Sequence, residues 1–124
     1  MNLVDSSAWL EYFADGPNAS AFAPAIESTS SLLVPTLALY EVFKRVRQLV
    51  NEEEALRTVA LMEQGQVVDL DRATALEAAH LSLEHRLPMA DSIMLATARR
   101  NGATLWTQDA DFANLAGVRY FAKA

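Results

Sequence analysis

The sequence predicts an α/β domain with a mostly parallel sheet of four to five strands flanked by helices, and two features predict this fold class. Apolar segments of strand length recur along the chain, as in the buried strands of parallel sheets. Longer segments between them carry apolar residues at helical spacing. With 124 residues, 52% of them hydrophobic, the chain fits one domain over residues 1–124 with a substantial core.

The first half of the chain alternates between strand and helix. Asn2–Asp5 is a short apolar strand that ends in an acid, and Ser6 or Ser7 is suited to cap the helix that follows. This helix is stopped by the turn at Asp15-Gly16-Pro17. The next predicted elements are a helix over 19–27, a strand over 32–34, a helix from 36 to 50 and a helix over 52–64.

The second half continues the alternation. Pro88 opens a helix that runs to Arg100 and is closed by Asn101-Gly102. The other predicted elements are a strand over 66–70, a helix over 72–84, a strand over 104–107, a helical turn over 111–115 and an edge strand over 118–121. Ligands of parallel sheets bind outside the carboxyl ends of the strands. Asp5 and Asp109 both follow predicted strands, so we expect them to share that edge.

Composition excludes several classes of site. The chain has no cysteine, so it has neither a disulfide framework nor a thiolate metal site. No apolar run has the length of a membrane span, and no signal peptide precedes Asp5, so a cytoplasmic protein without membrane contact is expected. A net charge of −6 argues against a broad basic surface for nucleic acid. It leaves open an enzyme whose acids gather around metal ions.

Each candidate acid also has an ordinary structural explanation. Asp5 could end a strand or cap a helix. Glu41 lies three and four residues before Lys44 and Arg45, the spacing of an exposed helical ion pair. In the segment 107–112, either Asp109 or Asp111 could cap the short helix. Spacing alone therefore leaves these alternatives open.

Asp91 is the most informative acid. Met94, Leu95 and Ala98 follow it by three, four and seven residues, so it lies on the apolar face of its own helix. A buried carboxylate needs a cation, hydrogen-bond donors or a metal ion, because burying it alone is costly. The alternative is that Asp91 caps the helix that begins near Pro88.

Four segments together resemble a known family. They are Leu3–Leu10 (LVDSSAWL), Pro35–Val42 (PTLALYEV), Leu87–Ala96 (LPMADSIMLA) and Thr104–Phe112 (TLWTQDADF). In this order they resemble the four motifs of PIN-domain nucleases, and the match extends over nearly the whole chain. Its length and motif positions most resemble the ribonuclease toxins of VapC-type toxin–antitoxin pairs.

The resemblance implies a metal-dependent ribonuclease with a cluster of four acids, Asp5, Glu41, Asp91 and Asp109. Asp5, Asp91 and Asp109 are the implied metal ligands, and the implied auxiliary residues are Asp111, Ser6 and Thr107. Hard cations such as Mg²⁺ or Mn²⁺ prefer oxygen ligands and suit phosphodiester hydrolysis. A water activated by the metal is the expected nucleophile, oriented by Asp5 or Asp91.

The resemblance also implies partners. RNA is the implied substrate, and the basic residues Lys44, Arg45 and Arg99 either line its approach or form solvated helix faces. An antitoxin segment is implied in an apolar groove near the first helix and the Glu41 helix, and a homodimer is the implied assembly.

Two rival interpretations differ in class. A non-catalytic adaptor of PIN fold would be expected to have lost its acids, which this chain retains. A receiver-type phosphoacceptor domain would need paired acids after the first strand and a lysine after the fifth. Here a single Asp5 follows the first strand, and the only late lysine is Lys123.

Overall fold

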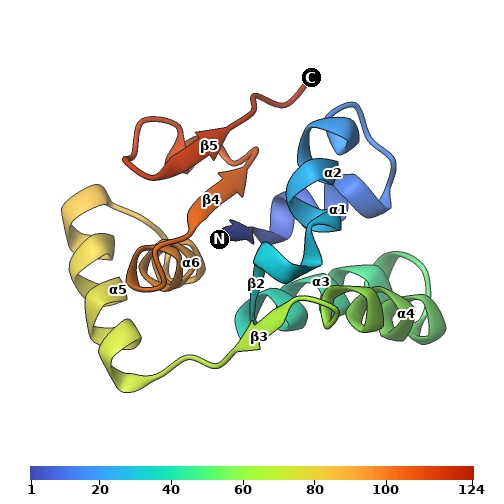
Figure 1. Cartoon of the computed structure of the whole chain (residues 1–124), viewed down its shortest axis with the longest axis horizontal. Helices are drawn as coiled ribbons and strands as arrows, with labels where there is room; N and C mark the ends of the chain where they lie inside the picture. Colours follow the sequence, from blue (N-terminus) through green and yellow to red (C-terminus); the bar gives the residue numbers. More distant parts are fainter.

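A computed structural model describes all residues, 1–124, and contains a single five-stranded sheet (Figure 1). The strands are β1 (Asn2–Val4), β2 (Leu32–Pro35), β3 (Gln66–Val68), β4 (Thr104–Thr107) and β5 (Val118–Tyr120). Their order is β3-β2-β1-β4-β5, and every neighbouring pair is parallel. The predicted α/β class is confirmed, and the sheet is parallel throughout.

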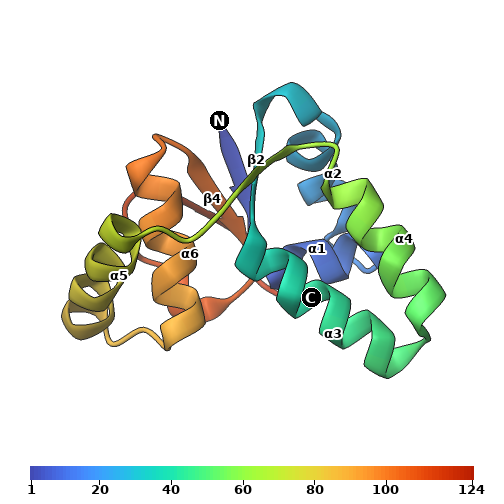
Figure 2. The ribbon, with the colours of Figure 1, turned by 90° about the horizontal axis from the view of Figure 1, so that it is seen from below.

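Six α-helices lie on the two sides of this sheet (Figure 2). One group contains α1 (Ser6–Phe13), α2 (Ala19–Glu27), α3 (Thr36–Leu49) and α4 (Glu52–Met62), and the other contains α5 (Arg72–His85) and α6 (Met89–Arg100). Two short 3₁₀ turns, η1 (Thr29–Ser31) and η2 (Ala110–Phe112), complete the chain. The turn predicted over 111–115 thus begins one residue earlier and is shorter. None of the helices combines the length and apolar character needed to cross a membrane.

The strands at the centre are apolar because helices cover both faces of the sheet. Leu3 and Val4 of β1, Leu33 and Val34 of β2 and Leu105 of β4 are all within 1% of complete burial. A strand exposed on one face would alternate between apolar and polar residues. The short continuous apolar runs in the sequence therefore reflect burial on both sides.

Successive strands are added first on one side of β1 and then on the other. The chain moves outward from β1 through β2 to β3, then crosses to β4 on the other side of β1. Open parallel sheets leave a crevice at such a reversal point, outside the carboxyl ends of the strands. Asp5 follows β1 and Asp109 lies just beyond β4, so both acids lie at this crevice.

Candidate active site

Asp5 is a buried carboxylate at the junction of β1 and α1, with only 4% of its surface exposed. It is the N-cap of α1, and its Oδ1 accepts a hydrogen bond from the backbone N–H of Ala8 at 3.1 Å. The prediction that Ser6 or Ser7 caps this helix was wrong, because the helix begins directly after the strand. The Ser7 hydroxyl instead donates to Asp5 Oδ1 at 2.7 Å.

Thr107 ties the ends of the two central strands together. Val4 pairs with Trp106 in the parallel register, so the next residues, Asp5 and Thr107, lie side by side. The buried Thr107 hydroxyl donates to Asp5 Oδ2 at 2.7 Å and accepts from the backbone N–H of Asp109 at 2.9 Å. One hydroxyl thereby holds two of the predicted acids in fixed relative positions.

The electrostatics of Asp5 reflect two opposing effects. Burial raises the pKa of the Asp5 carboxyl above its usual value. Hydrogen bonds from Thr107, Ser7 and Ala8 lower it in part, and the negative charge of Asp109 raises it further. Asp5 is therefore held in place by three hydrogen-bond donors, and a cation bound nearby would lower its pKa.

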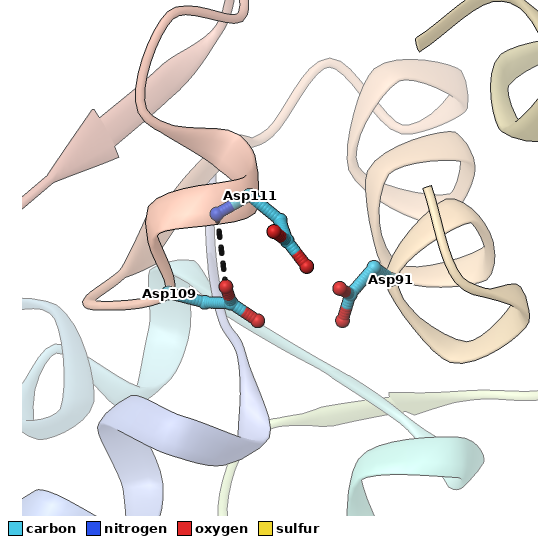
Figure 3. Close-up of side chains that lie close together, drawn as sticks. All are labelled: Asp91, Asp109 and Asp111. Atoms are coloured by element: carbon cyan, nitrogen blue, oxygen red, sulfur yellow. Dashed lines mark hydrogen bonds between the residues drawn. The ribbon is translucent and has the colours of Figure 1, made fainter. Parts of the chain in front are cut away.

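Asp91, Asp109 and Asp111 bring their carboxylates together (Figure 3). One oxygen from each lies within 4.8 Å of the others. Asp91 projects from the first turn of α6 toward the segment after β4. Asp109 caps η2 by accepting the backbone N–H of Asp111 at 2.9 Å, so the capping alternative for Asp109 also holds.

Asp91 has no protein group that compensates its charge. It does not cap α6, because the N-cap residue is Pro88 and no side chain makes a capping hydrogen bond there. Burial, followed by the charges of Asp109, Asp5, Asp111 and Glu41, raises the pKa of Asp91 to about 7. None of the ion pairs within 4.0 Å in the structure involves these acids.

Glu41 faces the other acids and makes no helical ion pair. Its Oε1 accepts a hydrogen bond from the Ser6 hydroxyl at 2.7 Å, across 35 residues of sequence. The expected ionic partners are engaged elsewhere, since Arg45 donates to Gln48 and the Lys44 ammonium lies over the Tyr40 ring. The exposed ion-pair explanation for Glu41 is therefore wrong.

The four acids named from the sequence line one cavity of about 310 Å³. Its other lining residues are Ser6, Ser7, Leu10, Arg45 and Met94. Ser7 was predicted only as a helix cap, although a hydroxyl two residues after a strand-end acid is well placed to reach it. Asp111 is exposed and does not line this cavity, but its carboxylate lies beside Asp91 and Asp109.

The three predicted basic residues are not equivalent. Arg45 lines the acidic cavity, and Lys44 borders an adjoining hollow that includes Glu41 and Arg45. Arg99 is near the other end of α6 from Asp91, about 12 Å along the helix at 1.5 Å per residue. Its guanidinium donates to the backbone carbonyl of Ala116 at 3.0 Å. Arg45, rather than Arg99, is the arginine placed beside the acids.

The donor set fits a hard divalent cation. The site offers carboxylate and hydroxyl oxygens and contains no histidine or cysteine. Mg²⁺ and Mn²⁺ prefer such oxygen ligands, and Mg²⁺ accepts a few carboxylates while keeping several waters. The uncompensated charge on Asp91, Asp109 and Asp111 is what a cation would neutralise. When bound, such an ion supplies Lewis acidity and positive charge at a phosphate group.

Comparison with known proteins identifies the family. The family model described as PIN domain matches residues 3–118. The chain belongs to the PIN domain family. Membership excludes the receiver-domain alternative, and a search of curated protein sequences gave no significant match.

Solved structures share the fold of this PIN domain. One from a toxin–antitoxin complex of Klebsiella pneumoniae superposes with a TM-score of 0.81 and 23% identity, over 96% of each chain. A VapC toxin of Mycobacterium tuberculosis, described as cleaving the sarcin-ricin loop, gives 0.77 and 16% identity over 94% of this chain and 95% of that one. A DNA-bound VapBC structure from Salmonella typhimurium gives 0.75 and 16% over 98% of each chain. At these identities the likeness concerns the fold.

Proposed function

We propose that this PIN domain is an endoribonuclease that hydrolyses RNA phosphodiester bonds with the help of Mg²⁺ or Mn²⁺. The observation that carries the proposal is the state of Asp91. This carboxylate is half-buried, lies among four other acids and has no cationic or hydrogen-bonding partner in the protein. Such an arrangement is unfavourable unless a cation binds there.

Each side chain of the site has its own role in this proposal. Asp91 and Asp109 hold the cation, with Asp5 as a third ligand, and Asp111 assists from the exposed side. Three hydrogen bonds fix Asp5, so its carboxylate also orients the attacking water. Glu41, held by Ser6, forms the opposite wall, and Arg45 provides positive charge for the phosphate backbone.

The direct test is cleavage of RNA by the purified chain. We expect cleavage with Mg²⁺ or Mn²⁺ and none in excess EDTA, because without a cation nothing in the site activates the attacking water. Restoring Mg²⁺ after EDTA should recover the activity, which controls for unfolding by the chelator. Undiminished cleavage in EDTA would exclude the metal mechanism. A folded chain that cuts no RNA under any condition would favour the adaptor alternative.

We further propose that the chain is the toxin of a toxin–antitoxin pair in the cytoplasm and acts as a homodimer. Support for the toxin role comes from two structural neighbours whose descriptions name a toxin–antitoxin complex and a VapBC complex. It also comes from a groove of about 610 Å³ between α1, α3 and α4. Its apolar lining consists of Leu10, Phe13, Ala14, Val46, Leu49, Val50 and Leu61.

This groove is suited to the apolar face of an antitoxin segment. Leu10, Ser7 and Arg45 line both the groove and the acidic cavity, so a bound segment would end beside the acids. Occupation of the groove therefore provides a physical route to inhibition.

If the antitoxin binds in this groove, a substitution there should weaken relief by the antitoxin without reducing toxicity. Leu49 lines the groove and is 65% exposed, so Leu49→Asp places a charge in it without disturbing the core. We expect this variant still to arrest growth of a bacterial host, but to resist relief by the coexpressed product of the adjacent gene. Affinity for that product should fall at least about tenfold, or about 1.4 kcal/mol. The matched control is Leu56→Asp, which changes a leucine that is 56% exposed on α4 outside the groove. Equal rescue of both variants would exclude this groove as the docking site.

A further inference from the structure

Tyr40 is an exposed aromatic residue directly beside the acidic site. It precedes Glu41 in α3 and is 61% exposed. The ammonium of Lys44, one helical turn later, lies 5.6 Å from the centroid of the Tyr40 ring. Apart from this cation–π contact, no hydrogen bond or core contact holds the ring, which is neither part of the core nor packed against it.

Two hollows meet at this ring. The smaller, of about 190 Å³, is lined by Tyr40, Glu41, Lys44, Arg45 and Gln48. It shares Glu41 and Arg45 with the acidic cavity, so the two spaces adjoin along one face of α3. The larger hollow, of about 720 Å³, is also lined by Tyr40, together with Leu39, Phe43, Lys44, Arg47, Gln48 and Val59. The shared lining residues therefore place the Tyr40 ring next to the acidic cavity.

The charged side chains around the Tyr40 ring are complementary to the phosphates of a nucleic-acid strand. The whole chain carries a net charge of −6, yet Lys44 and Arg45 place two positive charges on the hollow that Tyr40 shares with Glu41. Lysine and arginine contact phosphates, and aromatic rings accept unpaired bases by stacking. A base inside a duplex already stacks on its neighbours and cannot use such a ring without being extruded.

We propose that Tyr40 is a stacking platform for an unpaired base of the RNA substrate, next to the phosphate that is cleaved, with Lys44 and Arg45 contacting the flanking phosphates. This inference rests on the proposed ribonuclease function and adds a substrate-binding residue to it. A second copy of this chain is the alternative occupant of the same surface. Tyr40 binds and positions the substrate in this scheme and takes no part in the chemical step.

The test measures binding without cleavage. A fluorescently labelled, unstructured oligoribonucleotide is titrated in EDTA, and its anisotropy gives Kd. Stacking of one base changes affinity by about 5- to 150-fold, so Tyr40→Ala should raise Kd by a factor in this range. Tyr40→Phe keeps the ring and should stay within about twofold of the unmodified chain. Leu56→Ala, which removes another exposed apolar side chain of the same helix pair, should have no effect.

Further measurements separate the alternatives. With Mg²⁺, Tyr40→Ala should raise KM by a similar factor and leave kcat within about twofold. Binding to a fully paired duplex of the same sequence should not depend on Tyr40. Sedimentation of Tyr40→Ala should give the same assembly mass as the unmodified chain, and a lower mass would overturn the inference in favour of an interface between copies.

Failure of the inference and failure of the function give different results. Metal-dependent cleavage with an unchanged Kd and KM for Tyr40→Ala overturns the platform and leaves the ribonuclease intact. Equal losses in Tyr40→Phe and Tyr40→Ala overturn stacking, because the hydroxyl would then be the contact. RNA binding that depends on Tyr40, without any cleavage in Mg²⁺, overturns the ribonuclease proposal alone.

Discussion

Replacing Asp91 by asparagine should slow RNA cleavage at least about a hundredfold, equivalent to about 2.7 kcal/mol of added barrier. The substitution keeps the size of the side chain and removes the negative charge that faces Asp109 and Asp111. Asp91 makes no hydrogen bond that the amide would break, so the loss reports on the site rather than on folding. The measurement is the initial rate of cleavage at saturating Mg²⁺.

The other acids provide graded controls for this experiment. Asp109→Asn retains a good capping residue for η2 and should lose much more activity than Asp111→Asn, because Asp109 lines the acidic cavity and Asp111 does not. Loss of activity in Asp5→Asn is harder to interpret, because three donors hold the Asp5 carboxylate. The NH₂ group of the amide would face one of these donors and break its hydrogen bond. Equal losses for Asp109→Asn and Asp111→Asn would make Asp111 a full member of the metal site. Near-normal cleavage by Asp91→Asn would remove Asp91 from it.

Most of the fold could be predicted from local patterns in the sequence. The helix over 19–27 and the strand over 104–107 have the bounds that the pattern predicts, and the other elements differ by a few residues. Such agreement arises because apolar spacing and stop residues act over one or two turns. The cap of α1 could not be assigned in this way. Asp5, Ser6 and Ser7 are all good N-cap residues, and pairing with β4 decides where the strand ends.

The candidate site depended on contacts far apart in sequence. Glu41 has basic neighbours within its own helix, and only the tertiary fold brings Ser6 to it from 35 residues away. Arg45 and Arg99 look alike in sequence, and they differ because one lies by the acids and the other at the far end of α6. The contribution of Asp111 depends on the tight turn at η2, where the backbone N–H of Asp111 donates to Asp109 Oδ1 and both carboxylates face Asp91.

The repulsion among the acids also predicts how stability depends on pH. An aspartate in the unfolded chain titrates at about 3.9, whereas the pKa of Asp91 in the fold is raised to about 7. Between these values the folded state holds a proton that the unfolded state has lost, so stability falls as pH rises through this window. Above about pH 7 this contribution is constant. The raised pKa of Asp5 adds to the same trend.

Asp91→Asn should therefore melt at a higher temperature than the unmodified chain in EDTA at pH 8, by about 3 °C or more, with the difference vanishing near pH 4. A cation that binds only the folded state stabilises it, so millimolar Mg²⁺ should raise the melting temperature of the unmodified chain by several degrees. That rise should shrink in Asp91→Asn, because the variant has lost a ligand and part of the repulsion that the cation relieves. Asp69→Asn, which changes an exposed carboxylate between β3 and α5, should keep the full rise. Lower stability of Asp91→Asn in EDTA, together with an undiminished Mg²⁺ effect, would mean that Asp91 supports the fold and does not bind the metal.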